Sequence, residues 1–182
     1  MKKIILLSSL ALLCFNYTAQ ADSYQYSPYI GTDYTYNHTT ADGISPNYNT
    51  LNIRLGSDYS RWFATELFAA QSDTDTRHPQ NIKVKTSYRS YGLDLIALLP
   101  IGCDKKLSLL ATAGIGEYVF KQRIYPQKHS NEHGWGYRFG GGFKYAFDAH
   151  WQTRFVMRHV NFDHVSHIDH ALESTLGVEY HF

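Results

Sequence analysis

The last twelve residues of the chain alternate between apolar and polar side chains. Counting back from position 182 in steps of two gives mostly apolar residues, and the positions between them include two carboxylates, Glu173 and Glu179. Successive side chains of a strand point to opposite sides, so the pattern predicts a strand with one apolar and one polar face. A dry protein core would not accept the carboxylates without partners. An apolar face toward lipid and a polar face toward a barrel interior fit a transmembrane β-strand.

Seven further segments show the same period of two. The clearest lies at positions 135–148, where Trp135, Tyr137 and Phe139 alternate with glycines and with the cations Arg138 and Lys144. The connections alternate between short turns and longer polar loops, as in outer-membrane barrels. The sequence therefore predicts an all-β fold, an eight-stranded antiparallel up-and-down transmembrane β-barrel. Its strands are expected at about 28–37, 48–57, 62–71, 83–99, 107–122, 135–148, 151–160 and 171–182, with loops at 38–47, 72–81, 123–134 and 161–170.

Three charged residues depart from the apolar pattern of the outward positions. Lys85 and Arg89 share the outward parity of their strand, which is tolerable only if they stand beyond the hydrocarbon. Glu117 interrupts the outward positions of the following strand. We expect either a β-bulge or the membrane edge near it.

Charged residues dominate the inward positions. An eight-stranded barrel has an interior just wide enough to be filled by side chains, and a buried charge needs a partner. Five cations and four carboxylates nearly balance, which predicts a salt-bridged interior and no diffusion pore. A soluble lipocalin-like barrel, with the same strands but these charges facing water, is the alternative. The predicted charge network consists of Arg54, Glu66, Asp94, Arg138, Lys144, Arg154, Arg158, Glu173 and Glu179.

The first 21 residues are typical of a secretory signal peptide. Lys2 and Lys3 precede an apolar run that is too short to span a membrane as a helix, and Ala19-Gln20-Ala21 suits cleavage. We therefore expect residues 22–182 to form a single barrel domain, exported to the bacterial outer membrane. Cys103 is then the only cysteine of the mature chain, so no internal disulfide is expected. The net charge of +1 argues against a nucleic acid or another large polyanion as partner.

The C-terminus resembles the signal by which bacterial outer-membrane barrels are recognised by their insertion machinery. Gly177, Tyr180 and the terminal Phe182 carry this resemblance, together with polar Thr175 further back. In length, strand rhythm, inward Gly-x-Gly segments and terminal aromatic, the chain resembles small barrels of the opacity-protein and OmpX-like superfamily. The resemblance implies a monomer in contact with outer-membrane lipid and lipopolysaccharide, without cofactor or catalysis. It further implies a role in adhesion, in host-factor or ligand contact, or as a simple envelope protein.

An enzymatic alternative rests on a short motif. His164, Ser166 and Glu173 resemble the His-x-Ser…Glu arrangement of outer-membrane lipid A deacylases, with His as base, Ser as nucleophile and Glu orienting the His. The spacing from Ser to Glu is shorter than in that family, and His167 replaces the expected Asn. Glu173 also shares the inward parity, whereas acyl chains are reached from the lipid side.

Histidines are frequent at the predicted extracellular end, which carries eight of the ten. Imidazoles bind Zn²⁺, Cu²⁺ and Ni²⁺, so surface capture of metal or haem through His164, His167 and His170 is a second alternative. No cysteine accompanies these residues, and a loop lacks the fixed geometry of a helical site. The preferred interpretation is that they are ordinary polar loop residues, so we predict no metal site as the first choice.

Overall fold

A computed structural model describes residues 26–41, 47–77, 84–102, 106–124, 128–163 and 168–182. Strands make up nearly all of this part, and it contains no helix that could cross a membrane. The strands are β1 (Ser27–Ala41), β2 (Asn47–Ser60), β3 (Phe63–Ser72), β4 (Asp75–Arg77), β5 (Val84–Ile101), β6 (Leu107–Ile124), β7 (Lys128–Ala146), β8 (Trp151–Asp163) and β9 (Ile168–His181).

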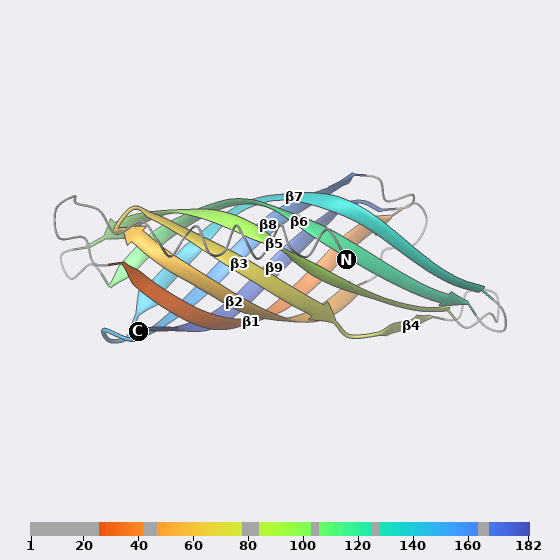
Figure 1. Ribbon diagram of the computed structural model, residues 1–182, viewed down its shortest axis with the longest axis horizontal. Coiled ribbons are helices and arrows are strands. Elements are labelled where there is room, and N and C mark those ends of the chain that lie inside the picture. Colours follow the sequence, from red (N-terminus) through yellow and green to blue (C-terminus); the bar gives the residue numbers. More distant parts are fainter. Residues whose placement is uncertain (1–25, 42–46, 78–83, 103–105, 125–127, 164–167) are drawn as a thin grey trace, which may run out of the picture.

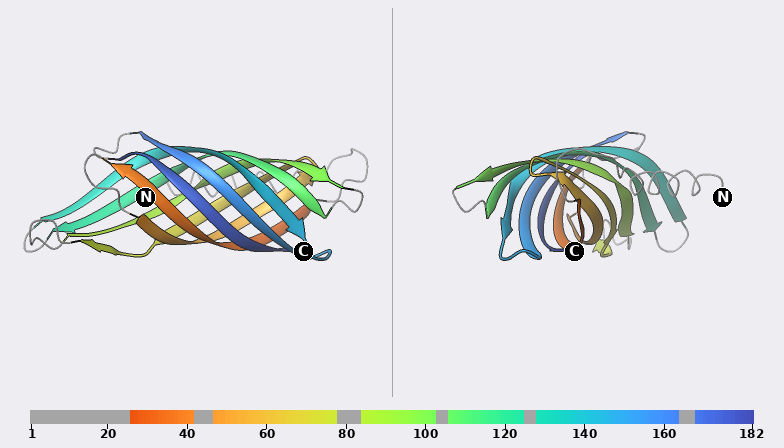
Figure 2. Two further views of the ribbon diagram at one scale, coloured as in Figure 1. Left: turned by 180° about the vertical axis from the view of Figure 1, so that it is seen from behind. Right: turned by 60° about the vertical axis from the view of Figure 1, so that its left-hand side comes forward.

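Antiparallel pairing closes these strands into a barrel. The order is β3-β2-β1-β9-β8-β7-β6-β5-β4, and a further pairing of β3 with β5 completes the ring. Because the short β4 and β3 both pair with β5, they share one position, and the ring has eight positions. The strands are tilted relative to the long axis of the barrel (Figures 1 and 2). The predicted eight-stranded antiparallel barrel is confirmed.

The C-terminal strand closes the cylinder against the first strand. Tyr29 stands opposite His181 in the β1–β9 register, and the backbone N–H of Phe182 donates to the carbonyl of Pro28 (3.1 Å). The β2–β3, β5–β6 and β7–β8 connections are at the same end of the barrel, and we call it the turn end. The opposite end, where β1 leads to β2 and β8 leads to β9, is the loop end.

Several strands run further toward the loop end than the sequence predicts. The predicted loop at 123–134 is largely strand: β6 continues to Ile124, which pairs with Lys128 at the start of β7. Strand β4 lies within the predicted 72–81 loop, and β1, β8 and β9 extend into the other two. Beyond the membrane both faces of a strand can be polar, so the backbone ladder continues without any hydrophobic alternation to reveal it. Strands β5, β6 and β7 project visibly beyond their neighbours (Figure 1).

The expected bulge near Glu117 is absent from the described strands. Registers between β5 and β6 and between β6 and β7 run without a shift past this residue. Glu117 lies on the outer surface, where its carboxylate accepts a hydrogen bond from the Tyr91 hydroxyl (2.5 Å) and lies 3.3 Å from Nδ1 of His133. Its position one outward step beyond Ile115 instead fits an edge of the apolar band.

The apolar side chains face outward. Leu51, Ile53 and Leu176 are 61–66% exposed, whereas Arg54, Arg154 and Arg158 are at most 1% exposed. A monomeric soluble protein would not expose a continuous apolar belt of this kind, but lipid would cover it. The lipocalin-like alternative, with charges outside, is therefore wrong.

Candidate functional site

The interior of the barrel is filled by side chains of three kinds. Toward the turn end lies an apolar cluster formed by Ala64, Ile96, Leu98, Leu110 and Val156, all of them buried. Charged side chains occupy the middle. Toward the loop end follows a group of aromatic rings.

Glu66 on β3 is the centre of the charged group. Nη1 and Nη2 of Arg154 on β8 each donate one hydrogen bond to its carboxylate (2.9 and 3.0 Å). Arg54 on β2 donates another (3.1 Å). The Tyr29 hydroxyl donates a further bond (3.1 Å). Glu66 thus joins strands that lie on opposite sides of the ring, and its burial makes these pairs costly to break.

Arg54 extends this group toward the closing strand. Its guanidinium lies 2.7 Å from Asp33 on β1, 3.1 Å from Glu66 and 2.9 Å from Glu179 on β9. Lys144 on β7 adds a second cation at Glu179 (2.7 Å). Three carboxylates therefore surround one guanidinium, and each comes from a different strand.

A second charged group lies beside the first. Arg138 on β7 donates to Asp94 on β5 (2.8 Å), lies 4.0 Å from Glu173, and stands 3.8 Å from the centroid of the Phe68 ring. Arg158 lies 3.7 Å from Asp94 and connects the two groups, since it is also 3.9 Å from Glu66. The described interior thus pairs cations with carboxylates throughout.

All nine residues of the predicted charge network are buried inside the barrel. That prediction omitted Asp33, which is 2% exposed and contacts both Arg54 and Arg154. Asp33 shares the inward parity of β1, so strand alternation alone could have included it. His181 was also omitted; its Nε2 lies 3.1 Å from Glu179, and its Nδ1 lies 3.1 Å from the Ser27 hydroxyl.

Inward glycines leave space for these long side chains. A Cβ at Gly31 would come within 2.6 Å of Arg54 Nη2, and one at Gly140 within 2.9 Å of Arg158 Cγ. At Gly140 it would also collide with the carbonyl oxygen of Met157. Close approach, rather than an unusual backbone angle, accounts for glycine at these positions.

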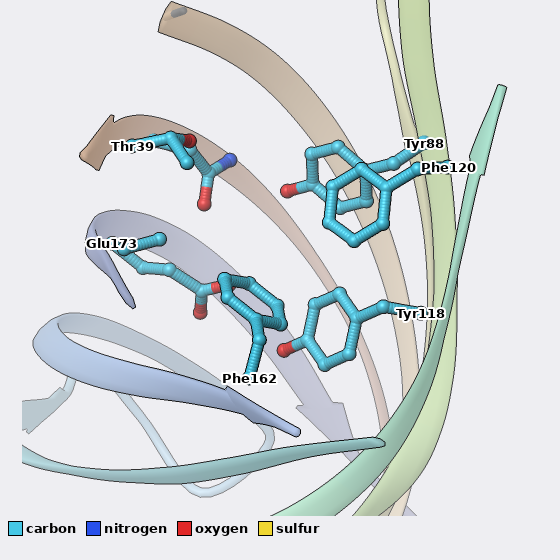
Figure 3. A pocket seen from close by; sticks show the side chains of 8 residues that line it. Thr39, Tyr88, Tyr118, Phe120, Phe162 and Glu173 are labelled. Atoms are coloured by element: carbon cyan, nitrogen blue, oxygen red, sulfur yellow. The ribbon is translucent and has the colours of Figure 1, made fainter. Parts of the chain in front are cut away.

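Aromatic rings fill the interior at the loop end. Tyr88, Tyr118 and Phe120 come from β5 and β6, Phe162 comes from β8, and neighbouring ring centroids are 4.9–6.4 Å apart. Figure 3 shows these rings turned toward one another around a small hollow, with Glu173 beside them. The hollow has a volume of about 10 Å³, roughly the room that one water molecule needs.

Histidines mark the end of the apolar band on four neighbouring strands. On β7, β8, β9 and β1, the outward positions change from apolar to polar at His133, His159, His170 and His38 respectively. The rings of His159 and His170 stack with their centroids 5.3 Å apart. His38 Nδ1 lies 2.8 Å from the Asn47 side-chain oxygen.

Most residues of the enzymatic and metal alternatives belong to one loop between β8 and β9. His164, Ser166 and His167 lie outside the described residues. Glu173 points into the barrel, and His170 stacks on His159. Among the described residues, no three His, Cys, Asp or Glu side chains are grouped so as to hold a metal ion.

The three residues of the C-terminal signal lie on both faces of β9. Gly177 faces inward beside Asp33, whereas Tyr180 and Phe182 face outward with ring centroids 5.4 Å apart. The Tyr180 ring also packs against Trp151 (5.1 Å). These aromatic residues form part of the outer surface at the turn end.

A closed antiparallel barrel with an apolar exterior and a charged interior defines an integral outer-membrane β-barrel protein. The chain belongs to the family described as the outer membrane protein beta-barrel domain, whose model matches residues 7–182. It is therefore a β-barrel protein of the bacterial outer membrane. No curated protein sequence matches the chain.

Solved structures of outer-membrane proteins have the same fold. Neisserial surface protein A is 13% identical with a TM-score of 0.73, and Ail of Yersinia pestis, solved with the heparin analogue sucrose octasulfate, is 15% identical with a TM-score of 0.64. The N-terminal β-barrel domain of Pseudomonas aeruginosa OprF is 12% identical with a TM-score of 0.61. Each match covers 87% of this chain and 100% of the other. These similarities show that the chain has the fold of small outer-membrane barrels, as the sequence predicts.

Proposed function

We propose that the protein is a surface barrel with a salt-bridged, non-conducting interior, and that its loop end contacts a ligand outside the cell, as in adhesion or host-factor binding. The observation that carries this proposal is the filled interior. Ion pairs and aromatic rings occupy the described lumen, and the hollow among the rings is about 10 Å³. A transport path would need space that these side chains take up.

Function then lies at the loop end. Loops on a rigid scaffold are where binding residues concentrate, and this scaffold is fixed by its continuous strand ladder. His38 lies exposed on the outer face of β1 at this end, where the apolar band ends, and its Nδ1 lies 2.8 Å from the Asn47 side-chain oxygen.

The proposal includes export and orientation. Residues 1–21 act as a cleaved signal peptide, and both termini of the mature chain face the periplasm. This orientation directs the loop end to the outside. Strand closure at Tyr29 and His181 supports placing the two ends of the barrel domain on one side.

Adhesion of vesicles to cultured epithelial cells tests this function. Fluorescent vesicles that carry the protein are compared with vesicles whose segments 42–46, 125–127 and 164–167 are replaced by Gly-Ser segments of equal length. The matched control replaces residues 149–150 at the turn end. We expect adhesion by the wild type and the control, and loss of adhesion in the loop variants. Equal adhesion by the wild type, the loop variants and the turn-end control would refute the proposal. So would the absence of adhesion by the wild type.

A further inference from the structure

Among the residues whose side chains the structure describes, three cations lie on the outward parity of β5 and β6 beyond the end of the apolar band. Lys85 and Arg89 belong to β5, and Lys121 on β6 pairs with Ser87, midway between them. On the same face of β5, the positions toward the turn end are apolar, beginning with Tyr91. The cations therefore lie on the outer surface on the loop-end side of the apolar band and do not belong to the interior network.

Within the described part of the chain, Lys85 and Lys121 make no ion pair, and Arg89 donates to the neutral side chain of Gln71. Glu117 on the outer face of β6 accepts a hydrogen bond from Tyr91 and contacts His133, and Asp73, which follows β3, accepts hydrogen bonds from Asn49. Cations that have no ion pair among the described residues and that lie beyond an apolar belt favour a ligand that has both acyl chains and negative charge.

The spacing of the cations indicates more than one phosphate. Lys85 and Arg89 are four residues apart on one strand, which separates their Cα atoms by about 13 Å. The third cation stands between them on the neighbouring strand. A phosphodiester carries one negative charge, so three cations spread over this length exceed the charge that a single phosphate supplies. A lipid with several phosphates on a sugar headgroup fits this arrangement better than a phospholipid with one.

We propose that the outward face of β5 and β6 at the loop end binds the phosphates of lipopolysaccharide through Lys85, Arg89 and Lys121, while its acyl chains lie on the apolar band below. Because this glycolipid lies in the outer leaflet, the inference rests on the orientation in the proposed function. The sugar headgroup of the bound lipid would then lie beside the projecting ends of β5 and β6.

Purified, folded protein in detergent is titrated with lipid A, with the same lipid after phosphatase treatment, and with phosphatidylglycerol at equal phosphate. Native mass spectrometry reads the bound lipid. The variants are K85Q/R89Q/K121Q and R89Q. The matched control is R61Q, because Arg61 is an exposed cation beside the Trp62 ring at the turn end (5.5 Å).

We expect the triple variant to bind lipid A on the order of 100-fold more weakly, since each cation near an anionic lipid surface contributes about fivefold. R89Q should lose about fivefold and R61Q nothing. Wild-type affinity in the triple variant would overturn the proposal. So would equal binding of the phosphatase-treated lipid or of phosphatidylglycerol. Purified protein in detergent is not oriented in a membrane, so these binding results do not depend on cell adhesion. Failure of the lipid-binding proposal and failure of the adhesion proposal are therefore recognised separately.

Discussion

Replacing Glu66 with glutamine should destabilise the barrel more than any single outward charge change. The carboxylate receives two bonds from Arg154, one from Arg54 and one from Tyr29, and it is 1% exposed. A glutamine whose oxygen keeps three of these bonds must turn its NH₂ group toward Arg154, where two donors face each other. The change also removes the negative charge between two buried guanidiniums. Breaking a buried ion pair in this way costs about 3–5 kcal/mol.

Urea unfolding in lipid vesicles, followed by the fluorescence of the exposed tryptophans Trp62, Trp135 and Trp151, measures this loss. The matched control is E117Q, the same substitution on the outer face, for which a partly exposed pair predicts about 0–1 kcal/mol. The reasoning would be refuted if the free energies of unfolding of E66Q and E117Q differed by less than about 1 kcal/mol, the value of a surface ion pair. It would mean that the interior ion pairs carry no more weight than surface contacts.

Three further predictions follow from individual contacts. G140A should destabilise the barrel by about 1–3 kcal/mol in the same assay, because its Cβ meets the Met157 carbonyl; the outward G141A, with its nearest atom at 3.3 Å, should cost less. Asp148 accepts backbone hydrogen bonds from His150 and Trp151 (2.8 and 2.7 Å), which holds the pKa of its carboxyl below the usual range. This stabilisation is present above the ordinary carboxyl pKa and is lost as pH falls through the lowered value. D148A should therefore unfold faster than wild type at neutral pH, and the two rates should converge in acid. Deletion of Phe182 should reduce heat-modifiable barrel in the outer membrane while synthesis and export continue; wild-type amounts would show that the terminal aromatic is coincidental.

Strand positions and their facing follow directly from the sequence, because lipid and the interior demand opposite polarity. Alternation alone sets Arg54 and Glu66 on the inward face. It does not reveal that Glu66 meets Arg154 across the lumen, since that contact depends on the stagger of strands distant along the chain. Which cation pairs with which carboxylate could therefore be determined only from the structure of the closed barrel.

The aromatic rings at the loop end were harder to predict. Tyr88, Tyr118 and Phe162 are aromatic residues near strand ends, and in a sequence such residues look like members of the interfacial girdles. Their parity is inward, but the strand segments around them are polar on both faces beyond the membrane. The same weak alternation hid the extension of β6 and β7 to Ile124 and Lys128.

Single-channel recording in planar bilayers tests the filled interior most directly. Wild-type protein, refolded and reconstituted at known density, is compared with a general diffusion porin in the same membrane. Because ion pairs around Glu66 and rings around Tyr118 occupy the lumen, we predict no stable conductance steps from this protein. Stable, ohmic steps of porin size from the wild type would contradict the account, since they would require a continuous aqueous path through the side chains that we describe as packed.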